Sequence, residues 1–172
     1  GELLDAAKVS RQDTTEHSGL QTVIWTQRVE DVSVFDSSFK ANLSRSGEIL
    51  SLSSTVMPEA ETAVETYLAT HATVVKNPPV DAPKAVSLAA ANIGLTVDPA
   101  QITKLPKTNP NFSADHYTGP GLSTTYLEKA WLPMDAASVR LAWAVTVSSA
   151  EHGAYLVMID AESGEPQFRA SL

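Results

Sequence analysis

The amino-acid sequence predicts an α+β fold, in which antiparallel sheets each pack on a helix. Apolar residues alternate with polar ones across residues 20–56 and again across 123–170, a period of two that is typical of half-buried strands. Between these regions, apolar residues recur every three or four positions in 58–76 and 81–94, which is typical of amphipathic helices. Each half of the sequence thus carries strands and a helix, and we expect two small lobes.

The boundary between the lobes is expected at the cluster Asn77-Pro78-Pro79, because this sequence cannot continue a helix. We assign residues 1–77 to the first lobe and residues 78–172 to the second. The two lobes are expected to meet near Asn77–Val80.

The strands of the first lobe are predicted from its alternation and its turns. β-branched and aromatic residues dominate 20–29, where Trp25 is expected to anchor the core. Gly47 lies in a hairpin signal and suits a positive φ. The elements expected in order are a short helix or strand at 2–9, a polar loop at 10–19, and strands at 20–29, 32–35, 39–43 and 49–52.

Both helices have recognisable starts. Pro58 is tolerated in a first turn, where Glu59 and Glu61 complement the helix dipole. Asp81 is expected to cap the second helix, and Gly94 to end it. The helix start thereby explains the carboxylate pair Glu59 and Glu61 without a role in catalysis.

The second lobe is expected to hold most of its strands after a long loop. Residues 96–104 can form one strand, whereas 105–121 are rich in Pro, Asn and Gly and are expected to be a loop, to which we assign no role. Trp131 and Trp143 lie in alternating segments and are expected to be core anchors. The remaining strands are expected at 123–132, 139–148, 154–160 and 165–170, with a tight turn at 160–164.

The composition limits the classes of function. With 172 residues, 43% of them hydrophobic, the chain can bury a core. A net charge of −8 argues against binding to nucleic acids or anionic lipids, which attract clustered positive charge. The absence of cysteine excludes a thiol nucleophile, a disulfide and a cysteine-based zinc site. No apolar run is long enough to span a membrane, and we expect a secreted protein whose signal peptide lies outside this sequence.

No arrangement of residues in the sequence points to catalysis. The serines lack a GxSxG motif, and there is neither a P-loop nor a GxGxxG motif. Asp160 and Glu162 are expected to be turn residues. The histidines do not form the HExxH motif that places two zinc ligands on one helical face; they are His17, His71, His116 and His152. We therefore expect a non-enzymatic chain that binds a partner and itself holds no metal or cofactor.

Stretches of the first lobe follow the order of a known propeptide motif. These stretches are Glu16–Leu20, Val23–Gln27, Val32–Phe35, Phe39–Leu43 and Ser46–Ser51. Together they resemble the fungalysin/thermolysin propeptide (FTP) motif, in which a strand ending in Gln precedes a turn, a second strand and a hairpin with Gly. The matching residues are Gln27 and Gly47.

The second lobe contains an R-L-A-W strand, Arg140–Trp143, and a D-A-x-S-G-E hairpin within Tyr155–Glu165, preceded by Ala130–Pro133. These stretches resemble the PepSY-like segment that closes the pro-region of fungalysin-type peptidases, especially bacterial ones. The matching residues are Trp143, Asp160 and Gly164. Asp160 suits this hairpin because Asp bonds turn amides, and Gly164 because glycine accepts a left-handed conformation.

The combined resemblance implies a PepSY/cystatin-like pro-region of a secreted zinc metalloprotease precursor. Such a region helps the catalytic domain to fold and inhibits it until cleavage, so the implied partner is that domain and the zinc is expected there. We expect the C-terminal segment to contact the protease, either as an extended tail or through strand pairing; an ordinary last strand with a frayed end is the alternative. The residues of this segment are Gln167, Phe168, Arg169, Ala170, Ser171 and Leu172.

Two other functions are weighed against the pro-region. A free-standing secreted PepSY-like module that binds proteins or inhibits proteases is the first alternative, and an HExxH domain downstream in the same reading frame would favour the pro-region over it. A hydrolase is the second, and no residue pattern supports it; stoichiometric zinc in the purified chain would reopen it.

Overall fold

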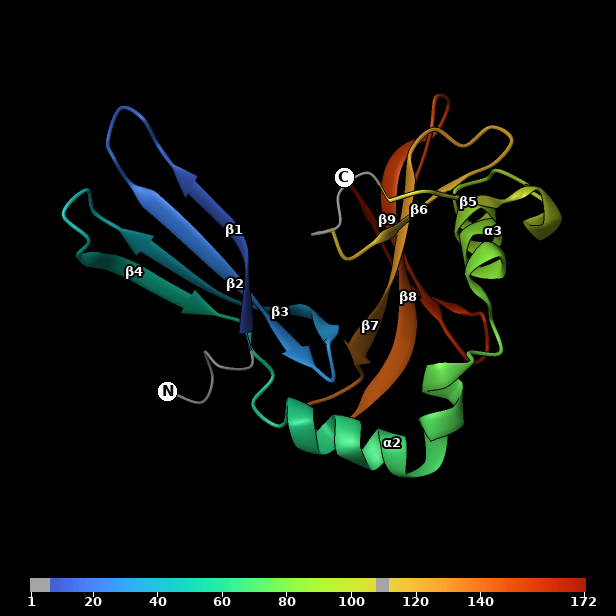
Figure 1. Ribbon diagram of the computed structural model, residues 1–172, viewed down its shortest axis with the longest axis horizontal. Helices are drawn as coiled ribbons and strands as arrows, with labels where there is room; N and C mark the ends of the chain where they lie inside the picture. Colours follow the sequence, from blue (N-terminus) through green and yellow to red (C-terminus); the bar gives the residue numbers. More distant parts are fainter. Residues whose placement is uncertain (1–6, 108–111) are drawn as a thin grey trace. The chain divides into compact units, whose positions relative to one another are not determined.

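The computed structural model describes residues 7–107 and 112–172 (Figure 1). The described residues form a sheet-rich α+β fold, as the alternation predicted. The strands are β1 Ala7–Thr14, β2 Gln21–Val29, β3 Val32–Leu43, β4 Ile49–Ser54, β5 Thr103–Leu105, β6 Asp115–Thr118, β7 Thr125–Pro133, β8 Val139–Ser149, β9 Gly153–Asp160 and β10 Pro166–Ser171. The helices are α2 Ala60–Lys76, α3 Ala82–Asn92 and a 3-10 turn, η1 Pro99–Gln101.

The chain folds into two compact units. Unit 1 contains the residues up to Tyr67 together with Trp131–Val139, and unit 2 contains Leu68–Ala130 and Arg140–Leu172. The units therefore divide inside α2, ten residues before the division at 77 and 78 that the sequence predicts. Proline clusters mark where a helix must end, whereas compact units are set by packing partners distant in sequence. That the segments 1–77 and 78–172 are separate propeptide lobes stays a prediction.

Unit 1 is built on an antiparallel meander of β1, β2, β3 and β4. The predicted meander over 20–56 is confirmed, but the loop expected at 10–19 is wrong, since β1 runs to Thr14. The side chains of β1 from Lys8 onward are exposed, so no alternation reveals this edge strand. The strands expected at 32–35 and 39–43 are one strand, because the polar break between them is absorbed at a register shift and at Asp36, whose φ is 51°.

The buried part of unit 1 lies between β3, the first half of α2 and Trp131. Val34, Ala60 and Val64 are buried, and Trp131 is fully enclosed. The Nε1 of Trp131 donates a hydrogen bond to the carbonyl of Val29 at 3.0 Å, and its ring packs edge-on against Tyr67. Trp131 is thus the core anchor that the sequence predicted.

Unit 2 consists of antiparallel strands with α3 packed on β9 and β10. Figure 1 shows α3 beside these strands. The alanine-rich face of α3 lets the helix approach the sheet closely, and four of its residues are completely buried: Ala85, Val86, Ala89 and Ala90. Besides Trp143, the sheet of unit 2 buries mainly unbranched and branched apolar side chains; those that are fully buried include Leu141, Val145, Val147, Val157, Met158 and Ile159.

The start of α3 matches its prediction. The carboxylate of Asp81 accepts a hydrogen bond from the backbone N–H of Lys84 at 2.9 Å. After the helix, Gly94 has a φ of 90°, which ends the helical conformation as expected.

The connection between α3 and β7 differs from the prediction. Of the strand expected at 96–104, only Thr103 and Lys104 belong to a strand, β5, because Asp98 caps the turn η1 before it. The loop expected at 105–121 contains β6, a strand too short to show a period. The part of that loop at 108–111 lies outside the described residues.

Candidate functional site

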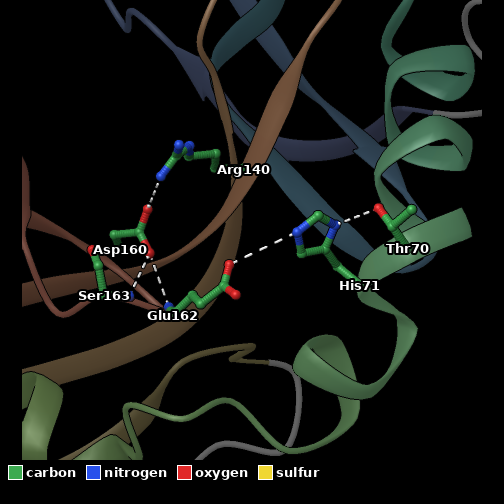
Figure 2. Close-up of polar contacts among 6 residues, drawn as sticks. All are labelled: Thr70, His71, Arg140, Asp160, Glu162 and Ser163. Atoms are coloured by element: carbon green, nitrogen blue, oxygen red, sulfur yellow. Dashed lines mark hydrogen bonds and ion pairs between the residues drawn. The ribbon is translucent and has the colours of Figure 1, made fainter.

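The turn between β9 and β10 is organised by one carboxylate. Oδ1 of Asp160 accepts hydrogen bonds from the backbone N–H groups of Glu162 and Ser163, each at 2.9 Å (Figure 2). The N–H of Gly164 donates to the carbonyl of Asp160 at 2.9 Å. Gly164 has a φ of 80°, a conformation that favours glycine, and a Cβ there would lie 3.1 Å from Leu88 Cδ1, so that the Leu88 side chain would have to shift slightly.

Asp160 is also the negative partner of an ion pair. Its second oxygen, Oδ2, lies 3.0 Å from Nη1 of Arg140 on β8 (Figure 2). The Asp160 side chain is only 3% exposed, whereas that of Arg140 is 53% exposed. Burial alone would raise the pKa of Asp160, but the N–H donors of Ser163 and Glu162 and the guanidinium of Arg140 hold that pKa below its ordinary value. Asp160 therefore stays ionised and fixes the turn.

The same turn faces a histidine at a kink in α2. His71 departs from helical geometry, with a φ of −123°, and its Nε2 lies 3.9 Å from Oε2 of Glu162. The Oγ1 of Thr70 lies 2.7 Å from Nδ1 of His71 (Figure 2). The order hydroxyl, imidazole, carboxylate is that of a catalytic triad, but 3.9 Å is too long for the hydrogen bond that orients a general base. The side chain of His71 is 35% exposed and that of Glu162 is 50% exposed.

Two side chains from the sheet hold the end of α2 and the segment between α2 and α3. Nε1 of Trp143 donates to the carbonyl of Val80 at 2.7 Å, and the N–H of Val80 donates to the carbonyl of Ala161 at 3.1 Å. Nζ of Lys129 donates to the carbonyl of Val75 at 2.6 Å and lies 5.6 Å from the centre of the Trp143 ring. Burial lowers the pKa of Lys129. Trp143 is thus both a core residue and a hydrogen-bond donor.

In unit 1, Gln27 is a second buried polar anchor. Its Nε2 donates to the carbonyl of Met57 at 3.0 Å, and its Oε1 accepts from the N–H of Met57 at 3.0 Å. The hydroxyl of Ser37 donates to the same Oε1 and accepts from the N–H of Met57 at 3.1 Å. The Gln27 amide thus pairs with a backbone as a neighbouring strand would, and it fixes the segment between β4 and α2.

Gly47 closes the hairpin between β3 and β4. Its φ is 85°, and a Cβ at this position would meet no atom within 4 Å. Backbone conformation alone therefore favours glycine there. Of the five residues that the family motifs single out, Gln27, Gly47, Trp143, Asp160 and Gly164, each has a structural role of this kind.

The C-terminal segment forms strand β10 and pairs with β9. Arg169 donates from Nη1 to the carbonyl of Asn92 at 2.9 Å, at the end of α3, and its guanidinium lies 5.8 Å from the ring centre of Tyr155. Phe168 is 41% exposed. The part of the chain from Gln167 to Ser171 is therefore an edge strand. An ordinary last strand is the alternative that the sequence analysis gave to an extended tail.

The histidines lie in separate places. His17 is exposed, His116 stacks on Tyr126 at 4.8 Å, and Nδ1 of His152 lies 3.1 Å from Oγ of Ser149. Within residues 7–107 and 112–172, no group of three His, Cys, Asp or Glu side chains is placed to hold a metal ion. The pairs Glu59 and Glu61, and Asp160 and Glu162, lie at a helix start and in a turn.

Trp25 is less buried than predicted. It is half-buried and packs against Phe39 with ring centres 5.6 Å apart. Sequence reasoning also missed Ser37 and Lys129, whose partners lie 20 and 54 positions away along the chain. No local pattern signals such contacts.

None of the helices in the described part of the chain is both long and apolar enough to cross a membrane.

Comparison with known proteins finds similarity only among solved structures. No family model and no curated protein matches the sequence. Among solved structures, the chain is similar to the C-terminal domain of YpeB from Bacillus megaterium, with a TM-score of 0.40 and 13% sequence identity. The match covers 98% of this chain and 57% of that one, so this chain spans little more than half the length of the YpeB chain.

Proposed function

We propose that this chain is the pro-region of a secreted zinc metalloprotease of the fungalysin type. In this proposal it assists the folding of the catalytic domain and then inhibits it. The catalytic domain carries the zinc and the HExxH motif, and the present chain supplies only binding surfaces. We propose a PepSY/cystatin-like architecture for its sheets and helices.

The observation that carries this proposal is the open outer edge of β10. In the described part of the chain β10 pairs with β9 alone, so its other side is an edge of the sheet. The N–H of Leu172 donates to the carbonyl of Ala154 at 2.9 Å. Because N–H groups alternate in direction along an antiparallel strand, those of Arg169 and Ser171 point to the outer edge.

An open strand edge of this kind can bind an extended segment of a protease by adding a strand. Proteases bind substrates in extended form, and a strand lying along the cleft would exclude substrate. The anchors at Asp160 and Arg169 keep this edge ordered before binding, so little entropy is lost when the complex forms. Binding to the native protease also favours its folding by mass action.

A free-standing protein-binding module is the second candidate, because an open edge pairs with any extended segment. An HExxH domain encoded downstream in the same reading frame would separate the two candidates.

The proposal is tested by refolding the catalytic domain with and without this chain in trans. We expect the chain to raise the recovery of active protease, and excess chain to inhibit that activity. Ser171→Pro removes one outward N–H from an edge position that tolerates proline, and it should weaken inhibition about tenfold. Ser171→Ala keeps the N–H and is the matched control. If the wild-type chain neither assists folding nor inhibits, the pro-region proposal is wrong.

A further inference from the structure

The sheet of unit 1 has edge strands at β1 and at β4. Within residues 7–107 and 112–172, β1 pairs with β2 alone and β4 pairs with β3 alone (Figure 1). An edge strand can pair with a strand of another chain, and proteins commonly prevent this with charged side chains, prolines, bulges or very short strands. The edge strands of this chain differ in how many of these features they carry.

Three of the edge strands are protected in this way. β1 contains the charged residues Lys8, Arg11 and Asp13, and its register shifts between Val9 and Arg11. β5 is only three residues long. β10 begins with Pro166 and carries the charge of Arg169. A strand added to one of these edges has to accommodate a charge, a missing N–H group or a very short ladder.

β4 lacks these protections except for one bulge. Its six residues contain no charge and no proline, and all of them are exposed. Ile49 is 62% exposed, Leu50 is 60% exposed and Leu52 is 54% exposed. The register shifts at Leu50, whereas Ser51–Ser54 pair regularly with β3. An apolar segment of about six residues without charge or proline, exposed on an edge, is typical of segments that pair with further strands.

The charge pattern of β4 makes this strand complementary to its own copy. Two identical strands can pair antiparallel about a twofold axis, which brings the same residues of both copies together. A pairing of β4 centred on Ser51 sets Leu50 of each copy opposite Leu52 of the other and opposes no charges. We propose that this chain self-associates by pairing β4 with β4 of a second copy, which joins two unit 1 sheets edge to edge. This inference is independent of the proposed function.

The net charge of −8 on each copy opposes this contact. Salt screens that repulsion, since the Debye length falls from about 30 Å at 0.01 M to about 3 Å at 1 M. The paired β4 strands contain no charges whose attraction salt could weaken, so the association should strengthen with salt. A six-residue seam is small beside the roughly 1,200 Å² of a stable interface. We therefore expect a weak dimer, with a dissociation constant of about 0.1–1 mM in high salt.

The experiment is sedimentation equilibrium of the full chain in about 0.01 M and about 1 M NaCl, at protein concentrations up to about 1 mM. Leu50→Lys places a charge in the seam. Val9→Lys is the matched control, because Val9 is also apolar and 48% exposed but lies on β1. Each variant adds one positive charge to the net charge of −8, and both should keep the wild-type thermal unfolding midpoint.

For the wild-type chain we expect the dissociation constant to fall at least about fivefold from low to high salt. In high salt, Leu50→Lys should raise it at least about tenfold and Val9→Lys should leave it within about twofold of wild type. Three results would overturn the inference: a wild-type chain that stays monomeric in high salt, an association that salt weakens, or equal weakening by both lysine variants, which would place the contact away from the β4 edge.

Discussion

The sheet of β1–β4 and the sheet strands β8–β10 differ in how their side chains are buried. In unit 2, consecutive residues of β8 and β9 are enclosed, and α3 packs on β9 and β10 with a face of small residues. In unit 1, the four strands leave large apolar side chains exposed at Val9, Ile49 and Leu52. Unit 2 is therefore expected to draw its stability from apolar packing, and unit 1 to depend more on specific polar contacts such as that of Gln27.

Removing one tryptophan from each unit tests this difference most strongly. Trp143→Ala removes a buried ring and the hydrogen bond to Val80, and should lower the free energy of unfolding by about 3–5 kcal/mol. Trp25→Ala removes a half-buried ring and should cost about 1–2 kcal/mol. Urea unfolding monitored by circular dichroism measures both values. Equal losses would contradict the difference between the units.

The buried amide of Gln27 should produce the next largest effect. Gln27→Ala leaves the N–H of Met57 with only Ser37 as a partner and its carbonyl without the Gln27 donor, which should cost about 2 kcal/mol. Gln21→Ala, on the same strand, is the control and should cost less than about 0.5 kcal/mol. Hydrogen exchange should show faster exchange at Met57 in the first variant. Unchanged protection there would contradict the anchoring role of Gln27.

The sequence predicted best where local chemistry decides the structure. The cap at Asp81, the turn glycines Gly47 and Gly164, and the alternation of β2, β8 and β9 each follow from one residue or one short pattern. The sequence predicted poorly where pairing with a neighbouring strand decides whether a segment is extended. The side chains of β1 are exposed and β6 is only four residues long, so neither strand shows an alternating pattern. The division inside α2 could not be predicted, because it depends on Trp131–Val139 returning to unit 1 from far along the chain.

The candidate site shows the same contrast between what local sequence determines and what distant contacts determine. Gln27 and Asp160, two of the residues that the motifs single out, are buried and hydrogen-bond to the backbone in the structure. Their partners, Met57 and Arg140, lie 30 and 20 positions away, and only the folded strands bring them together. From the sequence, the segment 167–172 can be either a tail or a strand. The difference depends on pairing with β9, a contact that no local pattern of residues reveals.

Acid should affect the stability of the two units differently, because the buried anchor of unit 2, Asp160, is a carboxylate and that of unit 1, Gln27, is an amide. The pKa of Asp160 lies below its ordinary value of 3.8 in the folded chain, so the unfolded chain binds the proton more readily. The stability that ionised Asp160 contributes is then fully present above about pH 5 and is lost as the pH falls below 3.8 through the folded-state pKa. Gln27 does not titrate, so its contacts persist over the same range.

The Asp160→Asn variant tests this difference in pH dependence. It keeps an oxygen for the turn N–H groups but loses the charge facing Arg140, and should cost about 1–2 kcal/mol at pH 7. At pH 3 the wild-type chain has lost part of the same contribution, so the gap between wild type and variant should narrow. Unfolding free energies at pH 7 and pH 3, with Gln27→Ala as the control whose gap stays constant, provide the test. A gap for Asp160→Asn that is equal at both pH values would mean that the ionised carboxylate does not hold the turn.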